Sequence, residues 1–256
     1  MFFQPKPTCE TNCNNQSTDD NYTTQPQTEP EQKKEYQLSD YVSFSEVTFT
    51  VTFPEEVEKG HTEDVLRKVE LKNISSQTAN KFNTAQDEMI AYDNYYVISR
   101  ENKANASING SILSAYNVIK NNEIYGVTGQ AGTISYNLET QKELSNNELA
   151  NSYSLTIEEI YNTVLQNLVN NVTADAFLLS TIGDVTAPTI SVTDFANKIS
   201  EYAKTLSSNP ELLKLYLDEE NTIHALYQQR EVLEALGMGT HMGIGLQGGY
   251  QDVKLK

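Results

Sequence analysis

The sequence has few of the residues that usually mark chemical or membrane functions. Among 256 residues there is no tryptophan, and 18 basic residues stand against 35 acidic ones, which gives a formal net charge of −17. Such an excess of negative charge repels phosphate backbones and anionic lipid headgroups. No apolar run approaches the roughly 18 residues that predict a membrane-spanning helix. We therefore expect no tight nucleic-acid binding and no membrane partner, and a protein that is cytoplasmic when made.

Candidate catalytic, metal and cofactor residues are also scarce. The two cysteines, Cys9 and Cys13, lie in a polar tail, and the three histidines share no ligand spacing with them. Residues 243–248 (GIGLQG) match the spacing of a dinucleotide-binding loop, but that loop must follow a strand and open a helix, and here it nears the chain end. We expect His224 on a helix, where it could pair with Glu220. The sequence thus predicts no catalytic residue, no metal site and no cofactor.

Both ends of the chain are predicted to be extended arms. Residues 1–37 contain almost no aliphatic side chains, so they cannot bury enough apolar surface to order alone. We expect this arm to be disordered or ordered by a partner. Residues 238–256 are rich in glycine and form a second predicted arm. Its apolar residues, as candidate contacts with another subunit, are Met242, Ile244, Leu246 and Tyr250.

The clearest strand signal is residues 41–53. Apolar side chains alternate there with polar ones, as on a strand with one buried face, and the alternating set is Val47, Phe49, Val51 and Phe53. Val42 and Phe44 have the opposite parity, which indicates either a bulge near Ser45 or two separate strands. We treat the four alternating residues as candidate contacts with the edge of a neighbouring subunit.

Most of the remaining chain is predicted to be helical. Residues 156–181 carry apolar side chains every three or four positions, and Thr156 with Glu159 forms a capping box. Similar spacing predicts a helix over 62–98, and three helices make 156–237 an antiparallel unit whose later helices cover the first. With a mixed region at 38–155, the predicted fold class is α+β and mostly α. A helical bundle would form the body, with a small β element and two extended arms.

Arms on either side of an acidic body are typical of assembly subunits, because extended segments gain order by lying across neighbours. We expect a non-enzymatic structural subunit whose partners are other copies of itself and neighbouring assembly proteins. The most specific hypothesis is a tailed-phage virion protein at the head-to-tail connector or neck, where an acidic lining lets DNA slide. One alternative is a cytosolic adaptor or regulator that binds through the 62–98 helix. The other is an enzyme of unrecognised family, which a pocket of converging titratable groups would favour.

Overall fold

The computed structural model describes residues 34–52, 61–92, 97–124, 126–174, 212–235 and 249–255, with the isolated positions 191, 193, 194 and 197. The chain divides into two units, residues 1–34 and 35–256, and the elements below belong to the second. The strands are β1 (Val42–Thr52), β2 (His61–Leu71), β3 (Val97–Asn109), β4 (Ile112–Glu123), β5 (Gly126–Asn137), β6 (Lys142–Glu143), β7 (Lys214–Leu217), β8 (Ile223–Gln228) and β9 (Tyr250–Lys254). The helices are α1 (Leu38–Tyr41), α2 (Ser76–Ala91), α3 (Asn146–Ser152), α4 (Ile157–Ala174) and α7 (Gln229–Ala235).

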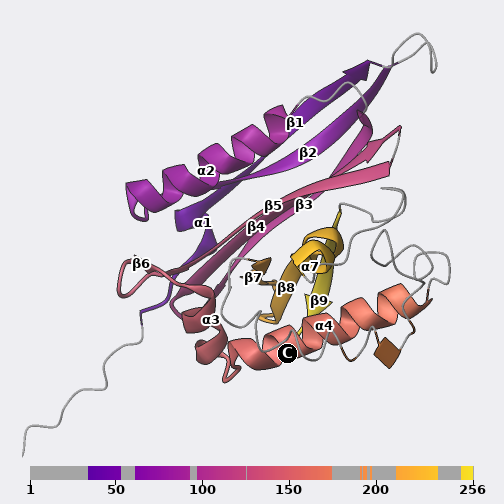
Figure 1. Ribbon diagram of the computed structural model, residues 1–256. Coiled ribbons are helices and arrows are strands. Elements are labelled where there is room, and N and C mark those ends of the chain that lie inside the picture. The colour runs from indigo at the N-terminus through magenta and orange to yellow at the C-terminus, as the bar shows by residue number, and fades with distance from the viewer. Residues whose placement is uncertain are drawn as a thin grey trace, which may run out of the picture. The chain divides into compact units, whose positions relative to one another are not determined.

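The body of the described structure is built from strands, so the prediction of a mostly helical bundle is wrong. Three antiparallel sheets are present among the described residues, with strand orders β1-β2, β3-β4-β5-β6 and β7-β8-β9. Figure 1 shows the β1-β2 hairpin and α2 on one side of the central sheet and β7–β9 on its other side, next to α4. No helix among the described residues is long and apolar enough to cross a membrane.

The central sheet occupies much of the region 38–155, for which the sequence predicted only a mixture of strands and helices. β3 and β4 are joined through Gly110, whose φ of +58° suits glycine in a two-residue hairpin connection. Both faces of the sheet are covered. Leu113 and Ala115 face the cluster that contains α2, whereas Ser114 and Tyr116 face β7. Burial on both faces removes the simple alternation by which a strand is recognised in a sequence.

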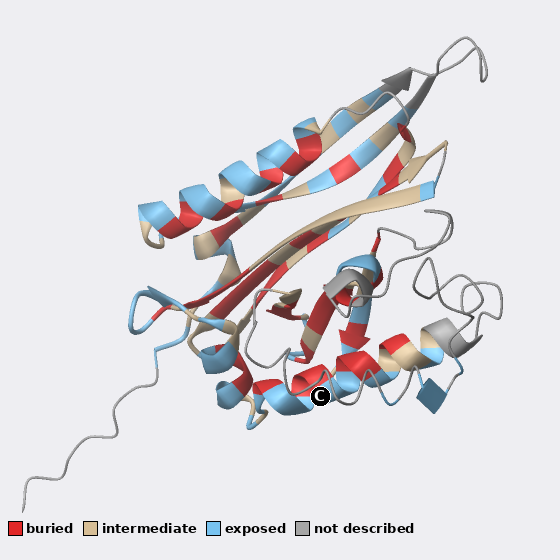
Figure 2. Cartoon of the chain, in the orientation of Figure 1, coloured by how far each residue is buried: buried red, intermediate tan, exposed pale blue. Residues whose placement is uncertain are grey.

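α4 is the element that the sequence predicted best. The capping box is confirmed: the Thr156 backbone N–H donates to the Glu159 carboxylate at 2.7 Å, and the Glu159 N–H donates to the Thr156 hydroxyl at 3.2 Å. One side of the helix is buried against the sheets, while the other is exposed (Figure 2). Ile160, Tyr161 and Leu168 are among its fully buried residues. Strands β8 and β9 contribute to the cover, where later helices were expected.

Three further predictions are corrected by the described strands. The helix over 62–98 is wrong, because 61–71 is β2, paired with β1, and the helix α2 begins only at Ser76. The helical unit over 156–237 is wrong after α4, because 214–217 and 223–228 are strands. Within the predicted glycine-rich arm, 250–254 is β9, which pairs with β8. In each case pairing with another strand decides the local structure, through hairpins for β2 and β7 and through a longer connection for β9.

β1 is one continuous strand, so the bulge or break expected near Ser45 is absent from its register with β2. The two parities of the hairpin contact different clusters. Val42 belongs to the larger core cluster below α2, and Val47 and Phe49 pack against a smaller one. Two-stranded ribbons twist strongly, which lets opposite faces reach the body at opposite ends.

The free edge of β2 is closed by side-chain carboxamides. The Asn83 and Gln86 side chains of α2 each accept from a backbone N–H of β2 and donate to the C=O of the same residue, at Leu71 and Val69 respectively. Asn102 on β3 does the same at Arg67. Three alternate residues of β2 thus find both backbone partners without a neighbouring strand.

A buried carboxamide chain links two of these caps. Asn117 on β4 donates to the Gln86 carbonyl oxygen at 3.1 Å, and its own carbonyl oxygen accepts from Asn102 at 3.1 Å. The exposed fraction of Asn117 is 0% and that of Gln86 is 2%. A buried polar network of this kind is stabilising only when its members are all satisfied.

We expect Gln86→Met to lower the free energy of unfolding by about 2 to 4 kcal/mol, because it leaves the buried Val69 backbone groups and Asn117 without their partner. Gln77→Met on the exposed side of the same helix is the matched control, with an expected effect within about 0.5 kcal/mol. Urea denaturation followed by circular dichroism measures both. Equal effects of the two substitutions would contradict a structural role for the carboxamide.

Candidate functional site

The outer edge of β1 carries backbone groups that point away from β2. On β2, side chains bind the backbone groups of Arg67, Val69 and Leu71 on the side that faces away from β1. In an antiparallel pair the directly opposite residues then also point outward. Their partners in register are Glu46, Phe44 and Val42, and the same parity continues to Thr48 and Thr50.

This edge is open over residues 44–50 in the described structure. The Val42 N–H is bound by the Leu38 carbonyl, which closes the start of the edge. Beyond it, β2 is the only strand paired with β1 among the described residues, and no described group bonds the outward N–H and C=O of Phe44, Glu46 or Thr48. These three residues are also exposed. The stretch has no proline and no lysine, two residues that commonly block strand edges.

The residues predicted as subunit contacts are placed as follows. Val47 and Phe49 are half-buried and face the chain's own core, where Phe49 also lies 4.5 Å from the Arg100 guanidinium carbon. Val51 is in β1, opposite Thr62. Tyr250 begins β9, and burial raises its pKa to about 12. The positions outside the described residues are Phe53, Met242, Ile244 and Leu246.

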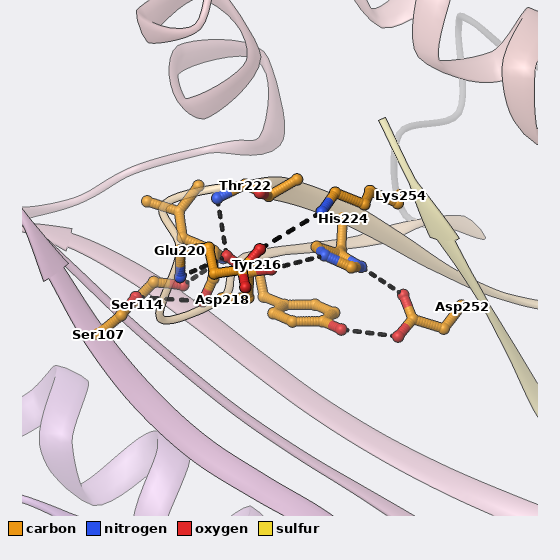
Figure 3. A network of polar contacts seen from close by, with 10 residues as sticks. Ser107, Ser114, Tyr216, Asp218, Glu220, Thr222, His224, Asp252 and Lys254 are labelled. Carbon is orange, nitrogen blue, oxygen red and sulfur yellow. Dashed lines mark hydrogen bonds and ion pairs between the residues drawn. The ribbon is translucent and has the colours of Figure 1, made fainter. Parts of the chain in front are cut away.

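A second polar cluster joins the three strands of the β7–β9 sheet (Figure 3). His224 on β8 lies between two carboxylates, with Nδ1 at 2.9 Å from Asp252 of β9 and Nε2 at 3.1 Å from Asp218, which follows β7. The Tyr216 hydroxyl donates to Asp252 at 2.8 Å. Since both ring nitrogens face carboxylate oxygens, only the protonated imidazolium can donate to both. The predicted pairing of His224 with Glu220 is wrong, because Glu220 instead lies 3.6 Å from Lys254.

Burial and hydrogen bonding set the protonation of this cluster. Burial alone would raise the pKa of Asp218, but hydrogen bonds from the Thr222 N–H, from His224 and from the Glu220 N–H together lower it below its ordinary value. Burial, followed by the hydrogen bond donated to Asp252, raises the pKa of Tyr216. The cluster therefore ties β7, β8 and β9 together through the contacts of His224 with two carboxylates, beside a tyrosine that stays neutral.

The same region docks onto the central sheet through hydroxyl groups and rings. Ser114 accepts from the Leu217 N–H at 2.9 Å, and Ser107 donates to the Leu217 carbonyl at 3.1 Å. The ring of Tyr216 lies between Tyr116 of β4 and His224, at centroid distances of 4.1 and 4.9 Å. Both serine hydroxyls thus hold β7 against the central sheet, and we interpret this contact as structural.

A polar cavity of about 340 Å³ lies elsewhere, between β5, α3 and β7. Its charged lining consists of Lys81, Glu143 and Lys214, and Lys81 is 2.8 Å from Glu143. The described groups with a shifted pKa at the β7–β9 sheet, such as Asp218 and Tyr216, do not line it. No group of three or more potential metal ligands is gathered in the part of the chain that the structure describes.

No protein-family model matches the sequence, and no curated protein matches it either.

The sequence predicts only part of the open edge and only part of the histidine cluster. The alternation in 41–53 correctly predicted a strand that offers an edge, but which edge stays open depends on side chains from Asn83, Gln86 and Asn102. For His224, the sequence offers a signal in the acidic run 218–220, which supplies Asp218. Asp252, 28 residues away, became a neighbour only through β9.

We expect Asp218→Asn to lower the free energy of unfolding by about 1 kcal/mol near pH 6, because the amide keeps the turn acceptor and loses the charge beside His224. The pKa of Asp218 is lowered in the fold, so its contribution is present above the ordinary aspartate pKa of about 3.9 and is lost as pH falls through the lowered value. The deficit of the variant should therefore shrink below about pH 4.

Denaturant titrations at several pH values measure this difference. Glu219→Gln, at the exposed neighbour, is the control and should change stability little at any pH. A deficit of Asp218→Asn that stays constant down to acid pH would contradict the charge interaction.

Proposed function

We propose that the protein is a non-enzymatic structural subunit of a multi-copy assembly, and that β1 is one of its subunit contacts. The observation that carries the proposal is the contrast between the two edges of one hairpin. Three carboxamides close the edge of β2 at Arg67, Val69 and Leu71, whereas no described residue pairs with the edge of β1 over 44–50. Open edges bind extended strands of other chains.

Two exposed apolar side chains lie on the outer face of the hairpin and support a protein contact. Phe44 is 40% exposed and Val65 is 59% exposed, and they are the large hydrophobic residues that stand out on the described surface. Val65 is directly opposite Thr48 in the hairpin, so it lies on the same face as Phe44. An added strand along β1 would satisfy backbone groups and lie beside Phe44, whereas Val65 is one strand further away, on β2.

Within this class, a component of a tailed-phage neck or connector stays our most specific proposal. Its support is the net charge of −17, which suits a wall past which DNA moves without binding. The test is immunoblotting of gradient-purified particles from the producing culture. Detection only outside particles would contradict the virion proposal and leave the multi-copy proposal in place.

An adaptor or regulator remains the alternative, with the hairpin in place of the corrected 62–98 helix as its contact. A complex of one copy with one copy of an unrelated protein, rather than several copies of this chain, would favour it. The enzyme hypothesis would gain support from turnover that depends on Lys81 or Glu143, the ion pair that lines the cavity.

We expect sedimentation velocity between about 1 and 100 µM, a range in which moderate contacts dissociate, to show species larger than the 28.7 kDa chain. The same should hold in a lysate of the producing cells. A monomer at every concentration and in the lysate would contradict the structural-subunit proposal as a whole.

A further inference from the structure

We propose that the polar cavity between β5, α3 and β7 binds a small organic carboxylate that also carries a hydroxyl or amino group. This ligand completes a set of hydrogen bonds between the central sheet and β7 that the described side chains complete only in part. The proposal does not depend on the role of β1 as a subunit contact, because it concerns other residues and another part of the fold.

Three serines form one row across the face of the central sheet that lies against β7. Ser107 on β3 is directly opposite Ser114 on β4, and Ser114 is directly opposite Ser135 on β5. Directly opposite residues carry their side chains on the same face of a sheet. Ser107 and Ser114 bind the two backbone groups of Leu217 (Figure 3). The third serine therefore also points toward the β7 side, where it lines the cavity.

The hydroxyl of this third serine has no partner among the described residues. Ser135 is 5% exposed, and its Oγ atom is buried without a hydrogen bond. Buried polar side chains in proteins nearly always have a partner, because leaving one unpaired is costly. A partner that is not part of the described chain is therefore expected in the cavity beside Ser135.

β7 has a matching gap in its hydrogen bonds. Its outward backbone groups belong to alternate residues, Leu213, Leu215 and Leu217. Asn146 binds the Leu213 carbonyl at 3.0 Å, and the two serines bind Leu217. Leu215 lines the cavity and is 2% exposed, yet no described side chain binds its N–H or C=O, and β8 is the only described strand paired with β7. A molecule in the cavity thus meets both a backbone donor and a backbone acceptor.

The charge of the lining favours an anion. Lys81 is paired with Glu143 at 2.8 Å, so these two charges offset each other. Lys214 is half-buried, and its ammonium group has no ion pair or hydrogen bond with a described residue. The lining therefore has one uncompensated positive charge, in a chain whose net charge is −17. A carboxylate suits this charge and can also accept from a hydroxyl and a backbone N–H.

The remaining acceptor and the volume narrow the class of ligand. The Leu215 carbonyl oxygen needs a donor, which a hydroxyl or amino group near the carboxylate supplies. The cavity volume of about 340 Å³ is near the lower limit of the roughly 300 to 1,000 Å³ that small-molecule sites occupy. Hydroxy acids and amino acids of about ten heavy atoms meet both requirements.

Isothermal titration calorimetry of the full chain tests the proposal, with L-malate, citrate and L-glutamate as probes. We expect at least one probe to bind with a Kd below about 1 mM. Malamide, in which amides replace both carboxylates of malate, is the neutral control and should bind at least about tenfold more weakly than malate, because it loses the charge interaction. Absence of binding by all three probes up to about 10 mM would overturn the proposal. Equal binding of malamide and malate would overturn the choice of a carboxylate.

A lysine substitution locates the site. We expect Lys214→Gln to weaken binding of the tightest probe at least about tenfold, because it removes the uncompensated charge. Lys142→Gln changes the net charge equally at an exposed residue that does not line the cavity, so it is the matched control and should bind like the wild type. Circular dichroism checks that both variants fold. Equal affinity of the two variants would place the probe outside the cavity and overturn the site.

Ser135→Ala separates a ligand-binding hydroxyl from a structural one. We expect this variant to bind the probe several-fold more weakly, while its ligand-free form has a urea midpoint at least as high as that of the wild type, because the hydroxyl lost is buried without a partner. Ser114→Ala is the comparison, and its urea midpoint should fall, since that hydroxyl binds Leu217. A lower midpoint for Ser135→Ala with unchanged binding would contradict the proposed contact.

Discussion

The carboxamide of Gln86 binds backbone groups of β2 that a neighbouring strand would otherwise have to bind. β2 ends its sheet, and its backbone groups at Val69 are buried beside α2, where an unpaired N–H or C=O is costly. One planar side chain supplies the acceptor and the donor together, and Asn83 repeats this one helical turn earlier at Leu71. Two carboxamides three residues apart on α2 thus bind two residues that are two apart on β2, and these four hydrogen bonds hold the helix along the strand.

Other features of the fold follow from this closure. Asn117 and Asn102 continue the chain of carboxamides to β3 and β4, so the hairpin is tied to the central sheet by hydrogen bonds as well as by apolar packing. At the far face, Ser107 and Ser114 bind both backbone groups of Leu217 by the same principle. Side chains in this protein therefore join sheets that share no backbone ladder. β1 has no such side chains on its outer edge in the described residues, and this difference supports the proposal that β1 is a subunit contact.

Local signals were read correctly from the sequence, and signals that depend on distant partners were not. The capping box of Thr156 and Glu159 and the spacing of α4 act within one helix, so their prediction holds. The pattern from Leu71 to Met89 predicted α2, but its extension back to 62 failed because pairing with β1 overrides helix propensity there. In the central sheet, polar residues such as Asn117 and Arg100 occupy buried positions, which hides the strand from any hydrophobic pattern. β1 could be predicted as a strand, while the closure of the opposite edge of the hairpin required the positions of three distant carboxamides.

Backbone groups alone give a strand edge affinity but little selectivity, because every extended peptide presents the same N–H and C=O spacing. Selectivity must come from the limits of the edge and from side chains beside it. Here α1 binds the Val42 N–H and so sets where pairing can begin, and Glu46 beside Arg67 disfavours an acidic neighbour. A net charge of −17 opposes non-specific encounters between copies, so a contact that forms must gain from the full length of the edge. An open strand on a strongly acidic chain can in this way remain selective for its partner.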